Sequence, residues 1–339
     1  MPNRYFHLGT YNPLTQQSTN LACVNCLQGY ACEHQGMSSV TVKCMAGYYC
    51  PTGSSSREPV NKYCTSGNYC PTKSYQPTPC LAGKYCLDNF LKSPNGLCMP
   101  GYYCNTGSTS SIEVLCNQGT YCPQGTANTA VQPCPIGTFG PMYGASLYSD
   151  CVKCTAGQNC PAQGLASPNP NCNVGYYCPS GQSTPTPLAY ICPMGYMCPV
   201  NSVAPLLCKE GEYQDQTGQG VCKACQAGYY CDTSDTTMML DCPKGYFCDV
   251  NSLVIPKPCL AGTYNNLLDQ TACINCNAGY MCPSRGLTTY TGTKCPAGYF
   301  CPAGTDYPAT TKPATICSNG KYCPLGTGSQ LGCPQGNFN

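Results

Sequence analysis

The residues of this chain whose type and spacing could do chemistry are its cysteines, which number 36 in 339 positions. Fourteen times they occur as C-x-x-G-x-x-C, often as C-x-x-G-Y-Y-C, from Cys26–Cys32 to Cys317–Cys323. Four C-x-x-C pairs also occur: Cys23/Cys26, Cys151/Cys154, Cys222/Cys225 and Cys273/Cys276. Thiols at this density either close disulfides or, as C-x-x-C pairs, bind zinc.

Histidine separates these two chemistries. Zinc modules commonly add histidine to cysteine, but His7 and His34 are the only histidines, and neither lies at ligand spacing from a C-x-x-C pair. We therefore expect disulfides, with zinc as the competing interpretation, and no metal or other cofactor. Because so many disulfides persist only in an oxidising compartment, we also expect an extracellular protein, secreted or on the cell surface.

The repetition of one short motif predicts a tandem array, in which each C-x5-C segment is called a module here. A module of under about twenty residues cannot bury a sufficient core, so bridges must substitute for one. The chain has 36 glycines and 32 prolines and no helical periodicity. We expect small disulfide-rich repeats in an elongated rod, with short β-hairpins, irregular loops and almost no helix. Spacing leaves open whether bridges close within a module or between modules.

Longer cysteine segments punctuate the array. Three are complete, and we expect each to close on itself, by the bridges Cys134–Cys151, Cys208–Cys222 and Cys259–Cys273. They divide the chain into residues 1–133 with six modules, 134–207 with three, 208–258 with two and 259–332 with three, followed by 333–339 as the start of another block or a joining tail.

Two cysteines have no place in this scheme. A fourth long segment ends at Cys23, but Phe6 occupies the position of its opening cysteine, and Cys333 opens a segment of the same kind. When Gly336 is aligned with Gly9, Cys333 falls on Phe6. Either the chain is a window from a longer repetitive protein, or copies of it join head to tail.

In the second case the joint between copies is a Cys333–Cys23 bridge or a strand inserted at the same place, with Phe6, Tyr11 and Phe338 packed around it. A head-to-tail contact need not close, and it then produces filaments. The alternative is that both thiols are free or paired within the chain.

Charge and hydropathy exclude several function classes. Charged residues make up 9% of the chain and its net charge is +2, with no basic stripe for nucleic acid. No run of about 18 apolar residues occurs, so no membrane span is expected. Residues 1–8 lack the apolar core of a signal peptide, so we expect a mature or internal portion of a longer precursor. Both histidines lie in the first block and the acidic residues are scattered, so we expect no enzymatic activity.

Serine and threonine gather in the loops between modules, whereas no N-x-[ST] sequon occurs. Such loops suit O-glycosylation, and simple polar turns would have the same composition. The candidate O-glycan positions are Ser54, Ser55, Ser56, Thr109, Ser110, Ser111, Thr184, Thr186, Thr310 and Thr311.

The pattern C-P-x-G-T-[YF]…C-x-x-C-x-x-G-Y-Y-C-P is approximated by Cys134–Cys160 and Cys259–Cys282. It resembles the ephrin-receptor-like cysteine-rich repeat, a relative of the tumour-necrosis-factor-receptor modules. The chain departs from it over Cys44–Cys122, where the C-x-x-C segment is skipped. Long tandem arrays of this kind also resemble protist surface proteins and the shaft proteins of flagellar hairs (mastigonemes). That resemblance implies an extracellular fibre.

We expect a structural subunit of an extracellular filament or fibril, a homopolymer assembled head to tail and coated with O-linked glycans. The alternative is a receptor-like or adhesive cell-surface ectodomain, or a surface antigen, that binds a protein ligand through its loops.

Overall fold

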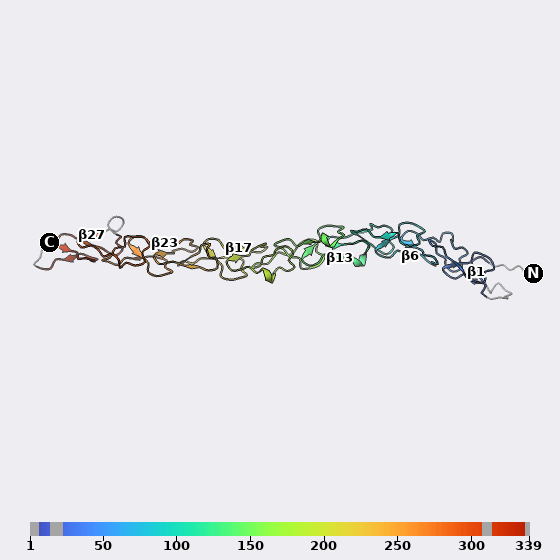
Figure 1. The fold of residues 1–339 in the computed structure, drawn as a ribbon, viewed down its shortest axis with the longest axis horizontal. Helices are drawn as coiled ribbons and strands as arrows, with labels where there is room; N and C mark the ends of the chain where they lie inside the picture. The colour runs from blue at the N-terminus through green and yellow to red at the C-terminus, as the bar shows by residue number, and fades with distance from the viewer. Residues whose placement is uncertain (1–6, 14–22, 307–313, 336–339) are drawn as a thin grey trace, which may run out of the picture. The chain divides into compact units, whose positions relative to one another are not determined.

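The computed structural model describes residues 7–13, 23–306 and 314–335. The chain forms two compact bodies, Met1–Pro170 with Ser180–Thr184 and Asn171–Pro179 with Pro185–Asn339. Both bodies are built from the same short hairpin, whose strands recur as small arrows in Figure 1.

The hairpin begins with a turn at the module glycine. In the first module the N–H of Tyr30 donates to the carbonyl of Leu27 at 3.1 Å, and Gly29 has a φ of 79°. A type II turn requires such a positive φ at its third residue, and glycine adopts it without steric cost. β3 (Tyr30–Ala31) follows and pairs antiparallel with β4 (Val42–Lys43), which ends directly before the next cysteine.

The same pairing of two-residue strands recurs from module to module. In the first body the other pairs are β1 (Thr10–Tyr11) with β2 (Val24–Asn25), β5 (Asn68–Tyr69) with β6 (Thr78–Pro79), β7 (Lys84–Tyr85) with β8 (Gly96–Leu97), β9 (Tyr102–Cys104) with β10 (Val114–Leu115), β11 (Thr120–Tyr121) with β13 (Gln132–Pro133), and β14 (Thr138–Phe139) with β15 (Val152–Lys153). In the second body they are β16 (Tyr196–Met197) with β17 (Leu206–Leu207), β18 (Glu212–Tyr213) with β19 (Lys223–Ala224), β20 (Tyr229–Tyr230) with β21 (Leu240–Asp241), β22 (Tyr246–Phe247) with β23 (Lys257–Pro258), β24 (Thr263–Tyr264) with β25 (Ile274–Asn275), β26 (Tyr299–Phe300) with β27 (Thr315–Ile316), and β28 (Lys321–Tyr322) with β29 (Leu331–Gly332).

A few elements depart from this pattern. Isolated antiparallel bridges replace the ladder at Tyr48↔Tyr63, Tyr176↔Ile191 and Tyr280↔Lys294. β12 (Thr126–Ala127) pairs parallel with β9. Helix in the described ranges is confined to the single 3-10 turns η2 (Asn128–Ala130), η3 (Tyr148–Asp150) and η4 (Leu188–Tyr190). The prediction of short hairpins with almost no helix is therefore confirmed.

Disulfide bridges form the buried centre of each module. Thirteen bridges among the described residues close a C-x5-C module on itself, as Cys44–Cys50 does with a Cα–Cα distance of 5.8 Å. The long segments are closed by Cys134–Cys151, Cys208–Cys222 and Cys259–Cys273. Pairing is thus local, and it engages all the sulfurs of three of the C-x-x-C pairs, which leaves those sulfurs no thiolate for zinc.

In the long segments another residue replaces the second cysteine of the module. Gly140, Gln214 and Asn265 hold this position. The Gln214 Nε2 donates to the carbonyl of Val221 at 2.7 Å, and the Asn265 Nδ2 donates to the carbonyl of Tyr246 at 2.8 Å. Both side chains are buried, so these hydrogen bonds offset part of their desolvation.

Backbone hydrogen bonds join each module to the next. The N–H of Gly29 donates to the carbonyl of Cys50 at 2.8 Å, and the N–H of Cys44 donates back to the carbonyl of Gly29 at 3.0 Å. The N–H of Gly53 donates to the carbonyl of Cys26 at 2.9 Å. Every donor and acceptor here belongs to the main chain, so the contact between modules tolerates a wide range of side chains.

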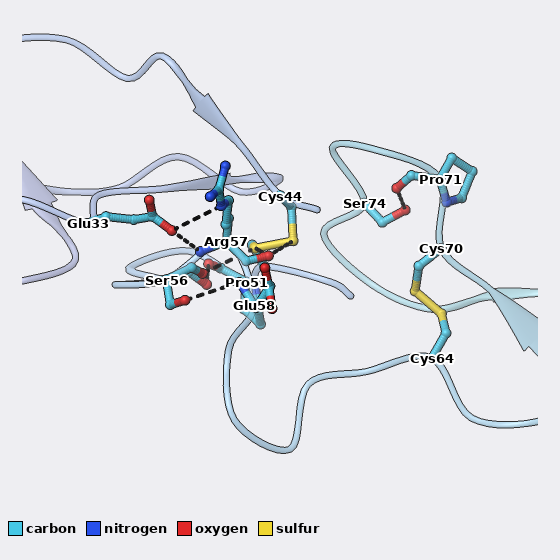
Figure 2. The surroundings of a disulfide bond; sticks show 12 residues. Glu33, Cys44, Pro51, Ser56, Arg57, Glu58, Cys64, Cys70, Pro71 and Ser74 are labelled. Carbon is cyan, nitrogen blue, oxygen red and sulfur yellow. Dashed lines mark hydrogen bonds and ion pairs between the residues drawn. A yellow bond between two sulfur atoms is a disulfide. The ribbon is translucent and has the colours of Figure 1, made fainter. Parts of the chain in front are cut away.

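Figure 2 shows how loops of neighbouring modules meet beside Cys44, which is bridged to Cys50. The carboxylate of Glu33 accepts the backbone N–H of Arg57 at 2.8 Å and lies 3.8 Å from its Nε. The carbonyl oxygen of Arg57 lies 3.6 Å from the Cys44 Sγ. An exposed ion pair contributes little stability by itself. Here the same carboxylate also holds the main chain of the loop against the bridge.

Candidate assembly surface

The module glycine is covered by a loop from two modules farther along. The carbonyl oxygen of Lys73 lies 2.5 Å from the point where a Cβ atom on Gly29 would be, so only glycine fits there. Lys73 itself has a φ of 73°, and its N–H donates to the carbonyl of Cys44 in the intervening module at 3.0 Å. One loop residue thus touches two modules, and we call it the covering residue.

This arrangement repeats inside each body. In the first body the glycine and its covering residue are Gly9 with Gly53, Gly29 with Lys73, Gly47 with Phe90, Gly67 with Gly107, Gly83 with Gly125, Gly101 with Gly144, Gly119 with Gly164, and Gly137 with Gly181. In the second body they are Gly175 with Gly218, Gly211 with Ser252, Gly228 with Asp269, Gly245 with Gly286, Gly262 with Gly304, and Gly279 with Gly326. The module glycine is therefore required by the packing of the array as well as by its own turn.

In the second body the hydroxyl of Thr236 covers Gly195 in place of a carbonyl, and two further module glycines have no cover within the described part of the chain. Among the described residues, nothing lies within 4 Å of the point where a Cβ atom on Gly298 or Gly320 would be, and both glycines are exposed, whereas Gly29 is buried. The first body presents the opposite situation. Gly36 has the positive φ of a covering residue, 79°, is exposed, and covers no glycine in the described ranges. Within the described residues, Gly320 is thus a module glycine without a cover, and Gly36 is a residue in the covering conformation without a glycine beneath it.

The structure leaves the cysteines expected at the joint unbridged. Cys23 directly precedes β2, Cys333 directly follows β29, and both thiols are half-buried. Tyr11 lies in β1 opposite Val24, the neighbour of Cys23. The other two residues expected at the joint, Phe6 and Phe338, lie outside the described residues.

Cys26 and Cys32 differ from the expectation that every module is bridged, because both are thiols here and both are buried. Burial raises the pKa of the Cys26 thiol to about 12, and the adjacent Cys32 contributes in the same direction. The backbone bonds from Gly29 to Cys50 and from Cys44 to Gly29 are nevertheless present. Docking between modules therefore holds the turn even where the sulfurs are not joined.

The position at which a strand could be inserted beside Cys23 is filled by the chain itself. β1 pairs with β2 in the register Thr10↔Asn25. The N–H of Gly9 donates to the carbonyl of Cys32 at 3.1 Å, and the N–H of Cys26 donates to the carbonyl of Gly9 at 2.8 Å. Residues 9–12 therefore pack on the module Cys26–Cys32 in the same way as residues 137–140 pack on the module Cys154–Cys160.

The candidate O-glycan hydroxyls differ in their surroundings. Ser54 donates its hydroxyl to the carbonyl of Pro51 at 2.7 Å, while Ser56 and Ser110 accept backbone N–H groups. Ser55 and Thr109 are exposed. The remaining candidates are the half-buried Ser111, Thr184 and Thr186, and Thr310 and Thr311, which lie outside the described residues.

The covering residues are the functional positions that sequence reasoning missed. A signal for them exists, because a glycine stands three positions after the second cysteine in many modules, as Gly53, Gly107 and Gly125 do. It is easily overlooked because Lys73 and Asn201 hold the same place in other modules.

Charged side chains pair locally across hairpins. The Lys257 Nζ lies 2.7 Å from the Asp249 Oδ1, and this hydrogen bond lowers the pKa of Asp249. The Lys223 Nζ lies 2.5 Å from the Asp215 Oδ1, with the same effect on the pKa of Asp215. These ion pairs are exposed, so each adds little stability and links only neighbouring segments of its own hairpin.

The described ranges contain no helix that is long and apolar enough to cross a membrane. No protein-family model matches the chain, and no curated protein is significantly similar to it. The chain is a cysteine-rich repeat protein of disulfide-bonded tandem hairpin modules.

Proposed function

We propose that this protein is a structural subunit of an extracellular filament or fibril, in which copies join head to tail. The observation that carries the proposal is the pair of complementary surfaces at Gly320 and Gly36. The glycines paired above with a covering residue show how such surfaces fit, with a loop carbonyl seated on a bare backbone. A second copy is a suitable occupant because it carries the same loop.

The alignment of Gly336 with Gly9 places both the glycine contact and the two unbridged cysteines in matching positions. When Gly336 takes the place of Gly9, Gly36 of the second copy lies two modules beyond Gly320, which is the spacing of every covering residue. The same register brings Cys333 to the position that Cys134 holds relative to Cys151. A disulfide then forms when the Cys333 and Cys23 thiols transfer two electrons and two protons to a disulfide-bonded oxidant, which becomes a dithiol.

The extracellular setting rests on chemistry. Sixteen bridges in the described part of the chain need an oxidising compartment to persist. The resemblance to ephrin-receptor-like repeats and to flagellar-hair shaft proteins belongs to the same proposal. O-linked glycans on Ser55 and Thr109 would keep a surface with few charges hydrated.

Microscopy with one matched pair of variants tests the proposal. Gly320→Ala adds a methyl group at the surface where the second copy docks, although the space around it is open in a single copy. Gly181→Ala is the control, because it has a similar φ of 86° and its nearest neighbour lies 3.8 Å away. Negative-stain images should show filaments for the unaltered chain and for Gly181→Ala.

For Gly320→Ala we expect the critical concentration for assembly to rise at least about tenfold, the effect of losing roughly 1.4 kcal/mol per joint. Short separate particles at every concentration of the unaltered chain would contradict the proposal. They would favour the alternative, a receptor-like or adhesive ectodomain that binds a protein ligand.

A further inference from the structure

We propose that residues 9–12 act as an internal plug, and that residues 336–339 of a second copy replace them by strand exchange. This inference rests on the proposed function, because it states how head-to-tail copies would engage. The site is the edge of β2 that β1 now pairs with, called the groove here, and the occupant is one named segment of this chain.

The groove recognises mainly backbone. Besides the β1–β2 pairing, its backbone contacts to the plug include the Gly9 N–H to the Cys32 carbonyl at 3.1 Å, the Cys26 N–H to the Gly9 carbonyl at 2.8 Å, and the Asn12 N–H to the Met37 carbonyl at 2.9 Å. The carbonyl of Gly53 occupies the space that a Cβ atom on residue 9 would need. A segment therefore fits if it has glycine at its first position and can extend through the next two residues.

Residues 336–339 meet these requirements. Gly336-Asn337-Phe338-Asn339 matches Gly9-Thr10-Tyr11-Asn12 with identical first and last residues and an aromatic at the third position. Cys333 precedes this glycine by three positions, as Cys134, Cys208 and Cys259 precede theirs. Phe6 holds that position before the plug, so the plug cannot form the bridge that locks the other long segments.

This asymmetry gives the exchange its direction. The plug is held by backbone hydrogen bonds and a two-residue strand, and a pairing this short is marginal alone. The incoming segment makes the same bonds and brings a cysteine toward Cys23, whose thiol is half-buried and unbridged. A single copy therefore stays closed, and contact with a second copy opens it.

One substitution at two equivalent glycines has opposite expected effects. Gly9→Ala drives a methyl group into the Gly53 carbonyl, expels the plug and opens the groove, so assembly should start without a lag. Gly336→Ala puts the same methyl group on the incoming strand, so assembly should stop. Because expulsion could disturb the first module, Asn12→Pro serves as a second way to open it, since it removes the N–H that donates to Met37, together with the Asn12 side chain, and leaves Gly9 unaltered.

A binding experiment separates this inference from polymerisation. The probe is a fluorescent peptide of residues 333–339 carrying Cys333→Ser, and the receptor is the full chain carrying Gly336→Ala, which disables its own incoming segment. We expect the peptide to bind at least about tenfold more tightly when the receptor also carries Gly9→Ala or Asn12→Pro. The control peptide carries Gly336→Ala in addition and should not bind.

The outcomes are distinguishable. Failure of the peptide to bind either opened receptor, or equal binding of the control peptide, overturns the plug. Peptide binding to the opened receptors while the unaltered chain never forms filaments supports the plug and overturns the proposed function. Filaments that form equally well with Gly336→Ala support the proposed function and overturn strand exchange.

Discussion

The carbonyl oxygen of Phe90 lies 2.6 Å from the point where a Cβ atom on Gly47 would be, so the two modules fit together only while position 47 is glycine. The ring of Phe90 stacks on that of Tyr63 with centroids 4.5 Å apart, and it also contacts Tyr48. Backbone approach and aromatic packing therefore hold the same loop.

Gly47→Ala should lower the free energy of unfolding by about 2–4 kcal/mol, because a positive φ of 92° and a backbone overlap act together. Urea denaturation with the bridges intact would measure it. Gly53→Ala is the matched control, since its φ is 80° but its nearest neighbour lies 3.7 Å away. Gly53→Ala should lower the free energy of unfolding only by the cost of the positive φ, about 1–2 kcal/mol. Equal losses in the two variants would contradict the covering role of Phe90.

The geometry within a module could be predicted from the sequence. The contact between a covering residue and the glycine two modules before it could not. The C-x-x-G spacing predicts a turn and a hairpin, because both depend on residues close in the chain, such as Cys44 and Gly47. The covering residue constrains its own φ and carbonyl but not its side chain. Lysine, phenylalanine and aspartate therefore occur there, at Lys73, Phe90 and Asp269, and no residue type marks the position.

The four cysteines that the structure leaves unbridged should be detectable by thiol labelling. In the folded, unassembled protein Cys23 and Cys333 are half-buried and should react with iodoacetamide, whereas Cys26 is buried and should not. Its pKa of about 12 against a usual value of 9.0 lowers its thiolate fraction by about a thousandfold. Unfolding without reductant should raise the number of labelled cysteines from two to four. A count that stays at two would mean that Cys26 and Cys32 are bridged.

The loop before Cys151 should weaken in acid. The Asp150 Oδ2 accepts the N–H groups of Ser146 at 2.8 Å and Leu147 at 2.9 Å, and these bonds hold its pKa below the usual value. A carboxyl whose pKa is lowered in the folded state stabilises that state above the unfolded pKa, about 4. This stability is lost as the pH falls through the lower folded value.

Asp150→Ala should therefore flatten the dependence of the denaturation midpoint on pH between about 2 and 5, where this carboxyl titrates. Asp215→Ala is a useful comparison, because the pKa of Asp215 is lowered chiefly by its hydrogen bond with the Lys223 side chain. Its effect should fade with added salt, which screens exposed ion pairs. Parallel pH curves for Asp150→Ala and the unaltered chain would contradict the role of these backbone bonds.

Asn265 replaces the second cysteine of its module, and its side chain is 0% exposed. Asn265→Ala would remove the Nδ2 that donates to the Tyr246 carbonyl at 2.8 Å and leave that acceptor unpaired. We expect a loss of about 1–3 kcal/mol, the cost of an unsatisfied buried group. The neighbouring Asn266 is exposed, so Asn266→Ala should change stability by under about 0.5 kcal/mol.

Hydrogen exchange would locate the effect of Asn265→Ala. The N–H of Gly245 donates to the main-chain carbonyl of Asn265 at 2.8 Å, so its exchange rate reports on the docking of this module. Faster exchange at Gly245 in Asn265→Ala, but not in Asn266→Ala, is the expected result. Unchanged exchange in both would mean that the backbone contact holds the module without the side chain, as it does at Gly29 where the sulfurs are not joined.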